Sequence, residues 1–166
     1  AQHTTRWTDS ALVLSGQLGF NKTEVKARNS QSPVLTGEQL FDDSQVTLIE
    51  RGQPRQHHVV AADLSTGPWN LNTRANYFGS VQGQGFTAPF VQTWDARWIV
   101  DLSVRYAFTR RLSLSVGANN LFDTYPTEWD KTKAAPFPQL GFTHCWETCP
   151  IGINGRQMYA RADWSF

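Results

Sequence analysis

The sequence lacks any uninterrupted run of about 18 apolar residues, the length that a transmembrane helix needs. It also lacks a nucleophile elbow, a glycine-rich phosphate-binding loop and an HExxH metal motif. Charge is scarce, because only 17% of the 166 residues are Asp, Glu, Lys or Arg and the net charge is +1. These absences exclude a membrane-spanning helix, leave catalysis without support and give no reason to expect nucleic acid as a partner.

Aromatic residues, in contrast, are abundant. They make up 13% of the chain and include seven Trp. Together with the low charge, this composition suits a surface that contacts lipid or sugar. The length predicts one domain. If the chain crosses a membrane, it does so with strands, because only a closed barrel satisfies every backbone polar group without helices.

Two alternating runs meet at a turn of about two residues within Trp98–Asp123 and predict a β-hairpin. The first run puts apolar side chains on one face and polar ones on the other, and the second run repeats the pattern. The apolar face carries Trp98, Val100, Leu102, Val104, Tyr106, Phe108, Leu112, Leu114, Val116 and Ala118; the other carries Asp101, Ser103, Arg105, Ser113, Ser115 and Asn119. An apolar face bracketed by aromatic residues is typical of an outer-membrane barrel strand.

The same alternation predicts four further strands, which makes about six in all. They are Ser10–Glu24, Arg55–Ser65, Trp69–Ser80 and Gly155–Phe166. Long loops are expected at Lys26–Pro54, with a short helix around Glu38–Ser44, at Val81–Asp95 and at Thr124–Asn154. Short turns are expected at Thr66–Pro68 and Thr109–Arg111. The connections therefore alternate between long and short.

Several motifs resemble the late barrel of TonB-dependent outer-membrane receptors. The main one is Val116-Gly-Ala-Asn-Asn-Leu-Phe-Asp-Thr-Tyr-Pro126, preceded by Asp101-Leu-Ser-Val-Arg-Tyr106 and followed by the final run Tyr159-Ala-Arg-Ala-Asp-Trp-Ser-Phe166. Upstream, Phe20–Val25, Leu40–Asp42, Ile49–Arg55 and Arg74–Gly79 match in the same order. The resemblance covers nearly the whole chain and departs from the family between Thr127 and Pro150.

The resemblance implies an all-β fold, in which residues 1–166 are the C-terminal portion of a barrel of about 22 antiparallel strands. The N-terminal plug and the TonB box that contacts TonB are then absent from this chain, which begins at Ala1 without an initiator Met and is expected to be a piece of a longer receptor. The implied function is import of a scarce nutrient, most commonly a ferric siderophore, across the outer membrane of a Gram-negative bacterium. Haem, cobalamin, a free metal and an oligosaccharide remain alternatives.

The implied partners are the TonB complex, reached through the missing plug, the rest of the same receptor, outer-membrane lipid, the barrel-assembly machinery and a small nutrient. No cofactor is expected. Because barrels of this class have short periplasmic turns, the two short turns are expected to face the periplasm. The last strand then ends at the periplasmic rim, where Tyr159, Trp164 and Phe166 resemble the signal that the assembly machinery reads.

Cys145 and Cys149 lie in the run His144-Cys-Trp-Glu-Thr-Cys149. Two thiolates and an imidazole could bind a soft metal, but such a site needs further ligands, and the sequence names none beyond His144. In an oxidising compartment a disulfide within a small loop is favoured. We therefore expect a disulfide and assign no metal ligand.

Charged side chains on the polar faces of the strands are expected to form ion pairs on a hydrated wall that faces the lumen and the plug. They are Asp63, Arg74, Asp101, Arg105, Arg161 and Asp163. His57 and His58 are adjacent on one strand, so their side chains point to opposite faces and do not face a single ligand. Packing near the membrane interface is the favoured role for both.

Two other classes of function remain. A soluble, secreted all-β carbohydrate-binding module would account for the strands, the Trp residues and the two cysteines. It would not account for the bracketing aromatics, the alternating loop lengths or an aromatic residue at the end of the last strand. An outer-membrane barrel enzyme would need a catalytic set, which the sequence does not contain.

Overall fold

The computed structural model describes residues 1–84, 90–132, 140–145 and 147–166. The fold is predominantly antiparallel β, with 48% of the described residues in strands and 9% in helices. This confirms the all-β class. Within the described residues, no helix is both long and apolar enough to span a membrane.

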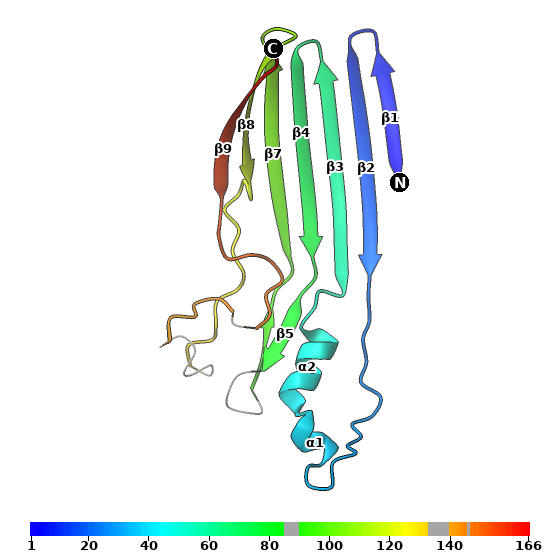
Figure 1. The fold of residues 1–166 in the computed structure, drawn as a ribbon, viewed down its shortest axis with the longest axis vertical. Helices are drawn as coiled ribbons and strands as arrows, with labels where there is room; N and C mark the ends of the chain where they lie inside the picture. Colours follow the sequence, from blue (N-terminus) through cyan, green and yellow to red (C-terminus); the bar gives the residue numbers. More distant parts are fainter. Residues whose placement is uncertain (85–89, 133–139, 146) are drawn as a thin grey trace.

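Seven strands form one antiparallel sheet in which each strand pairs with the next along the chain (Figure 1). In order across the sheet they are β1 (Gln2–Trp7), β2 (Ser10–Phe20), β3 (Gln56–Thr66), β4 (Trp69–Phe78), β7 (Arg97–Ala107), β8 (Leu112–Asn119) and β9 (Gln157–Trp164). Between β4 and β7 the chain forms a separate two-stranded hairpin of β5 (Val81–Gln84) and β6 (Val91–Trp94).

The connections divide by length between the two ends of the sheet (Figure 1). Short turns join β1 to β2, β3 to β4 and β7 to β8 at one end, which we call the turn end. The long connections and both helices lie at the other end, called the loop end. The alternation of long and short connections that the sequence predicts is therefore present.

Two features were not predicted. The first is β1, which extends the sheet by pairing Gln2–Trp7 with Ser10–Ser15 across a turn at Thr8 and Asp9. The second is the β5–β6 hairpin, which occupies much of the predicted loop Val81–Asp95; residues 85–89 of that loop lie outside the described part. Both segments are short, so the period-two alternation of apolar and polar residues extends over too few positions to predict a strand.

Strand ends also differ from the prediction, and pairing explains where they fall. β2 ends at Phe20, not Glu24, because Phe20 pairs with Gln56, the first residue of β3. β9 begins at Gln157 and ends at Trp164, because these residues pair with the two ends of β8, Asn119 and Leu112. A strand continues only as far as its partner offers backbone groups to bond.

The predicted short helix is two helices in the connection between β2 and β3. α1 spans Gly37–Leu40 and begins with a capping box in which Thr36 and Gln39 bond each other's backbone amides. α2 spans Asp43–Arg51, with the Asp42 side chain accepting from the Gln45 backbone N–H. Helix therefore continues seven residues beyond Ser44, the predicted end.

The strand register places the alternating residues on two continuous faces, as predicted. In one row, Leu12, Leu64, Leu71, Val104, Val116 and Ala160 lie directly opposite one another across six strands. We call this side the apolar face. The adjacent row carries Asp63, Asn72 and Ser103 on the opposite side, called the polar face.

Candidate functional site

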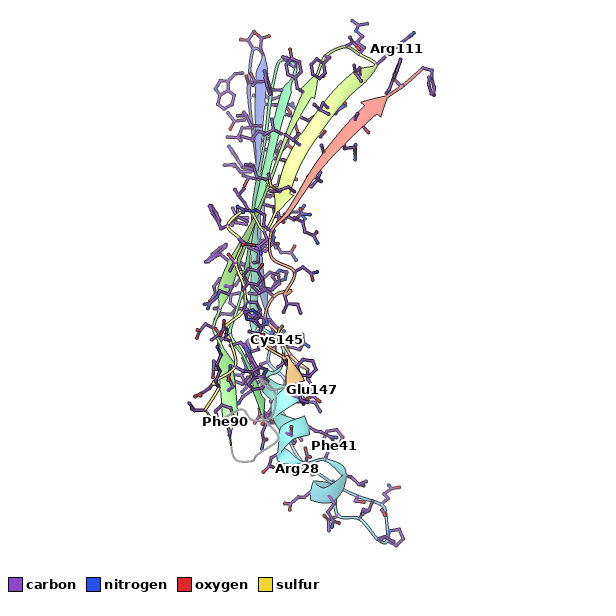
Figure 2. The ribbon with its side chains drawn as sticks, turned by 90° about the vertical axis from the view of Figure 1, so that its left-hand side faces the viewer. Arg28, Phe41, Phe90, Arg111, Cys145 and Glu147 are labelled. Carbon is purple, nitrogen blue, oxygen red and sulfur yellow. A yellow bond between two sulfur atoms is a disulfide. The ribbon has the colours of Figure 1, made fainter. Side chains whose placement is uncertain are left out.

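Large apolar side chains stay exposed on the apolar face. They are Leu14, Leu18, Phe20, Val60, Trp69, Leu71, Trp98, Leu114, Val116, Met158 and Trp164. Figure 2 shows the sheet nearly edge-on, as a single curved layer with side chains on both sides. Their exposed fractions run from 37% for Leu71 to 80% for Met158. Complete burial of one such side chain contributes about 1.5–3 kcal/mol, so an apolar environment would stabilise this face.

Aromatic rings gather in two bands on the apolar face. Near the turn end, Trp69 packs on Tyr106 with ring centroids 4.5 Å apart, and Tyr106 meets Phe108 at 4.8 Å. Near the loop end, Tyr77 lies 5.2 Å from Trp98 and 5.4 Å from His58. The rows between the two bands are mainly aliphatic, as in the Leu12 row described above.

The six charged residues predicted for the wall all lie on the polar face, as the register pairs of Arg74 with Asp101 and of Ser113 with Asp163 illustrate. Their contacts differ from the predicted ring of ion pairs. Among the described residues, only Arg161 and Asp163 of the six form an ion pair, at 3.0 Å.

Three of the other four, Asp63, Asp101 and Arg105, bond to neutral groups. Asp63 accepts hydrogen bonds from Asn70 (2.9 Å) and Asn72 (3.3 Å), and Asp101 accepts one from the backbone N–H of Asn120 (2.9 Å). Arg105 donates to the Ser113 hydroxyl at 3.1 Å. The polar residues spaced between the charges supply partners that the alternation pattern alone does not reveal.

Away from the strands, the loop end contains a small hydrophobic core. It consists of Val81, Trp94 and Trp129, with exposed fractions of 1%, 1% and 3%, and Phe90, Phe142 and Cys145 pack around it. The rings of Trp94 and Trp129 meet edge to face, 4.7 Å apart. The β5–β6 hairpin and the connection between β8 and β9 are thereby packed into one unit, which we call the loop cluster.

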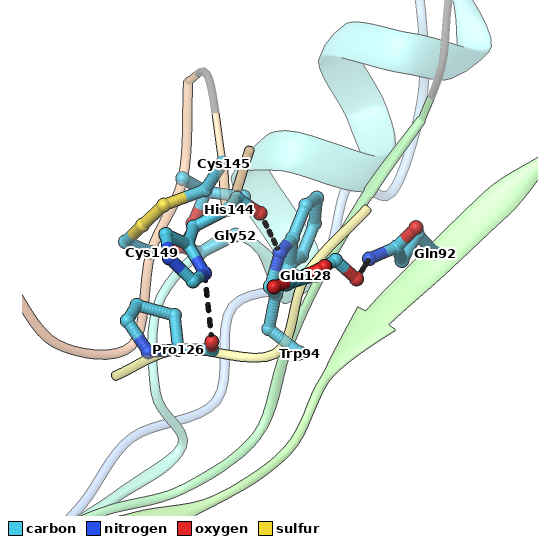
Figure 3. Close-up of a disulfide and its surroundings, with 9 residues drawn as sticks. Gly52, Gln92, Trp94, Pro126, Glu128, His144, Cys145 and Cys149 are labelled. Carbon is cyan, nitrogen blue, oxygen red and sulfur yellow. Dashed lines mark hydrogen bonds between the residues drawn. A yellow bond between two sulfur atoms is a disulfide. The ribbon is translucent and has the colours of Figure 1, made fainter. Parts of the chain in front are cut away.

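Partly buried polar groups hold the loop cluster together (Figure 3). The Gln92 side chain donates to the carbonyl of Glu128 and accepts from the N–H of Asp130, both at 2.8 Å. The indole of Trp94 donates to the carbonyl of His144, and the His144 ring lies 3.0 Å from the carbonyl of Pro126. Because these bonds involve backbone groups, they fix the path of the loop as well as its side chains.

A disulfide joins Cys145 to Cys149, with Cα atoms 5.8 Å apart, and encloses a small loop at the edge of this core. Trp146 of that loop lies outside the described residues. Thr148, which is 7% exposed, donates a hydrogen bond to the carbonyl of Gly52, the C-cap of α2. The disulfide loop therefore connects the helical connection to the connection between β8 and β9.

No three His, Cys, Asp or Glu side chains in the described part of the chain come together as a metal site.

In the connection between β2 and β3, the exposed Glu24 carboxylate bonds Lys26 at 2.9 Å. That hydrogen bond, with the charge of Lys22, holds the pKa of Glu24 below its usual value.

The two adjacent histidines point to opposite faces, as predicted. His58 lies on the apolar face, stacked on Tyr77 and edge-on to Phe20. His57 lies on the polar face, where it stacks on Phe78 with ring centroids 4.6 Å apart. His58 therefore packs within the loop-end aromatic band, whereas His57 is available to a ligand on the other side of the sheet.

The three residues of the expected assembly signal do not share one face. Trp164 ends β9 on the apolar face, and Phe166, which is fully exposed, lies beyond it with ring centroids 6.5 Å apart. Tyr159 lies on the polar face, opposite Gly117. A Cβ atom on Gly117 would come within 2.6 Å of the Tyr159 ring, so the tyrosine covers the glycine.

Sequence reasoning missed Gln92, Trp94, Thr148 and Gly52, which hold the loop cluster in place. Of these, Trp94 offered a signal, because a Trp beside the Gly-rich and Gln-rich segment is a candidate for burial. The partners of Gln92 and Thr148 are backbone carbonyls and amides far away in sequence, which no side-chain pattern encodes.

In comparisons with protein-family models, curated proteins and solved structures, nothing matches this chain.

Proposed function

We propose that this chain forms part of the barrel wall of a TonB-dependent outer-membrane transporter. The observation that carries the proposal is the exposed apolar face with an aromatic band at each end. Trp69 and Tyr77 are eight residues apart on β4, which corresponds to about 27 Å of strand. At a tilt of about 40°, the bands are roughly 20 Å apart along the membrane normal, comparable to the apolar belt of about 25 Å in outer-membrane barrels.

The arrangement of the connections supports the same proposal. Outer-membrane barrels have short periplasmic turns and longer extracellular loops. The turn end then faces the periplasm, and the loop cluster and helices face outward. The polar face lines the lumen, against the plug of the complete receptor. β1 and β9 are the edges of the sheet in this chain, and in the barrel they pair with strands of the rest of the receptor.

The proposed cargo is a ferric siderophore, on the strength of the motif resemblance around Val116–Pro126. The TonB complex would supply energy through the plug, and the barrel-assembly machinery would insert the protein. A soluble carbohydrate-binding module has less support. A soluble sheet buries its apolar face against a second layer, and the described residues place no second layer over the aliphatic rows of the strands.

Uptake measurements test the function. Deleting the gene for the protein that contains this chain should abolish TonB-dependent uptake of ⁵⁵Fe supplied as its ferric siderophore to iron-starved cells. The supplied siderophores should include a catecholate, a hydroxamate and a carboxylate. Unchanged uptake of all three would contradict the proposed cargo.

Labelling of intact cells tests the orientation. Single cysteines at Glu38, on α1, and at Thr66, beside a short turn, can be reacted with a membrane-impermeant maleimide. Glu38→Cys should be labelled and Thr66→Cys should be labelled only after the outer membrane is opened. The reverse result would contradict the proposed orientation, and labelling of both in a protein that does not sediment with membranes would contradict the transporter itself.

A further inference from the structure

A hollow of about 610 Å³ lies on the polar face at the loop end, beneath the segment that follows the disulfide. Phe78 and Ile99 form its floor on β4 and β7, and Cys149–Gly152 forms its roof. Ile151 is only 6% exposed. The hollow therefore lies between the sheet and the segment Cys149–Gly152, which we call the strap.

The strap is held in place by contacts that lie outside the hollow. The disulfide anchors the strap at Cys149, and one residue earlier Thr148 bonds the carbonyl of Gly52 at the end of α2. Trp94 holds the other end of the disulfide loop through the His144 carbonyl. A roof that is already fixed loses little conformational entropy when a ligand binds beneath it.

A second hollow of about 920 Å³ adjoins the first, because His57 and Asn76 line both. It extends along the polar face of β2 to β4, past Gln17 and Arg74. The walls of the first hollow are mainly apolar, whereas the second adds amide and guanidinium groups. We call these two adjoining hollows the groove; its apolar part lies beside Cys149–Gly152 and its polar part lies on the open sheet.

The charges along this groove are of one sign. Arg74 is the charged side chain that lines it, and His57 and Asn76 add N–H donors at the junction of the two hollows. No carboxylate is among the described residues that line either hollow. Asp101 lies opposite Arg74 on the same face but lines neither hollow, and its carboxylate accepts from the N–H of Asn120.

We propose that this groove is a binding subsite for an aromatic anion, with its ring under the strap, between Phe78, Ile99 and Ile151, and its negative group toward His57 and Arg74. Guanidinium groups bind carboxylates and related anions through charge-assisted hydrogen bonds, and a flat ring gains most from the apolar walls. The proposal rests on the proposed function, in which the polar face lines a water-filled lumen open to ligands from outside.

A series of probes that differ only in charge tests the subsite. The complete protein in lipid nanodiscs is titrated with 2-naphthoate, 2-naphthamide and 2-naphthylmethylammonium, and binding is followed by saturation-transfer NMR against empty nanodiscs. Naphthoate should bind at least about 10-fold more tightly than the cation, since one opposed charge contact contributes about 1.5–3 kcal/mol. Equal binding of the three probes would overturn the proposal.

The chain supplies a matched pair of variants. His57→Leu should weaken naphthoate binding, whereas His58→Leu, the same change one residue along on the opposite face, should leave it unchanged. Arg74→Gln should remove the preference for the anion, and Arg74→Lys should retain most of it. Equal losses in the two His variants, or an anion preference that survives Arg74→Gln, would overturn the assignment.

The outcome separates the subsite from the proposed function. If the strands lie in the bilayer and the probes do not discriminate by charge, the subsite is wrong and the barrel proposal stands. If the apolar face proves to be in water, the barrel proposal fails. Naphthoate binding that depends on His57 and Arg74 would then still support an aromatic-anion site on this sheet.

Discussion

At the scale of single residues, Thr148 is the hydrogen-bond donor that joins the disulfide loop to the helical connection. Thr148→Val keeps the shape of the side chain and removes the donor. Leaving the buried Gly52 carbonyl without this partner should cost about 1–3 kcal/mol. Local opening should become about 5- to 150-fold more frequent, which hydrogen exchange of amides in residues 147–152 would measure.

Thr143→Val is the matched control for that experiment. Thr143 is an exposed threonine of the same connection, and its contact in the loop cluster is made by its backbone carbonyl, which accepts from Trp129. The control should leave exchange unchanged. If both variants accelerate exchange equally, or neither does, the hydrogen bond of the Thr148 hydroxyl does not stabilise the disulfide loop.

The disulfide predicts a simple chemical result. Alkylation of the denatured, unreduced protein should add no label to Cys145 or Cys149, and prior reduction should add two, because these are the two cysteines of the chain. Mass measurement of the peptide that contains both residues decides the matter. Two labels without reductant, or stoichiometric metal in the purified protein, would contradict the pairing.

Gly117 illustrates a steric requirement within a strand. Its Cβ position is 2.6 Å from the Tyr159 ring and 2.8 Å from the Leu102 carbonyl oxygen, so a side chain there must displace backbone. Gly117→Ala should lower the thermal midpoint of unfolding, at a cost of about 1–3 kcal/mol. Gly16→Ala, in β2, is the control, because the nearest atom to its Cβ is 4.0 Å away. A larger loss in the control than in Gly117→Ala would contradict this packing.

At the scale of elements, the long strands follow from the sequence and the loop cluster does not. Runs such as Trp98–Phe108 alternate over enough residues to define a face, and direct pairing of Leu71 with Val104 confirms the faces predicted for the two strands. The strand ends depend on which residues the partner provides, as Phe20 and Gln56 illustrate. Local alternation contains no information about the partner's length.

The loop cluster depends on contacts between distant segments. Trp94 packs on Trp129, and Thr148 bonds to Gly52 across 96 positions of sequence. Neither contact is encoded in a local pattern. The polar face shows the same limit: its charged residues were predicted correctly as sharing one side, but Asp63 and Arg105 bond Asn and Ser side chains, which no rule of opposite charges predicts.

The end of β9 carries a prediction about assembly. Trp164 and Phe166 are exposed aromatics at the turn end, next to the aromatic band near Trp69. Such residues can anchor in the membrane interface and be recognised during insertion. Deleting Phe166 should therefore reduce the amount of protein in the outer membrane more than the uptake per inserted molecule.

The measurement compares surface abundance with ⁵⁵Fe uptake normalised to that abundance. Tyr159→Phe provides a control on the opposite face of the same strand, and it should preserve both quantities because the ring over Gly117 is retained. Normal abundance with lost uptake after deletion of Phe166 would instead place that residue in the transport path.

At the scale of the whole molecule, the proposed barrel wall requires that the two faces of one sheet meet different solvents. The apolar face presents many exposed Leu, Val and Trp side chains, and exposed apolar patches of this kind mark surfaces that contact a membrane or another protein. The polar face has hydrogen-bonded Asn, Asp and Arg side chains along its strands and a ligand-sized groove at the loop end. A barrel wall between lipid and a hydrated lumen satisfies both conditions.

Spin labels at Leu102 and Ser103 of the complete protein in lipid bilayers test this claim most directly. These neighbours lie in the middle of β7. Leu102 is on the apolar face, in the row of Leu14, Ala62 and Thr73, and Ser103 is on the polar face, in the row of Asp63 and Asn72. The label at Leu102 should be relaxed by oxygen and protected from a water-soluble nickel chelate, and the label at Ser103 should show the opposite preference. Equal accessibility of the two labels to both relaxers would contradict the barrel-wall account.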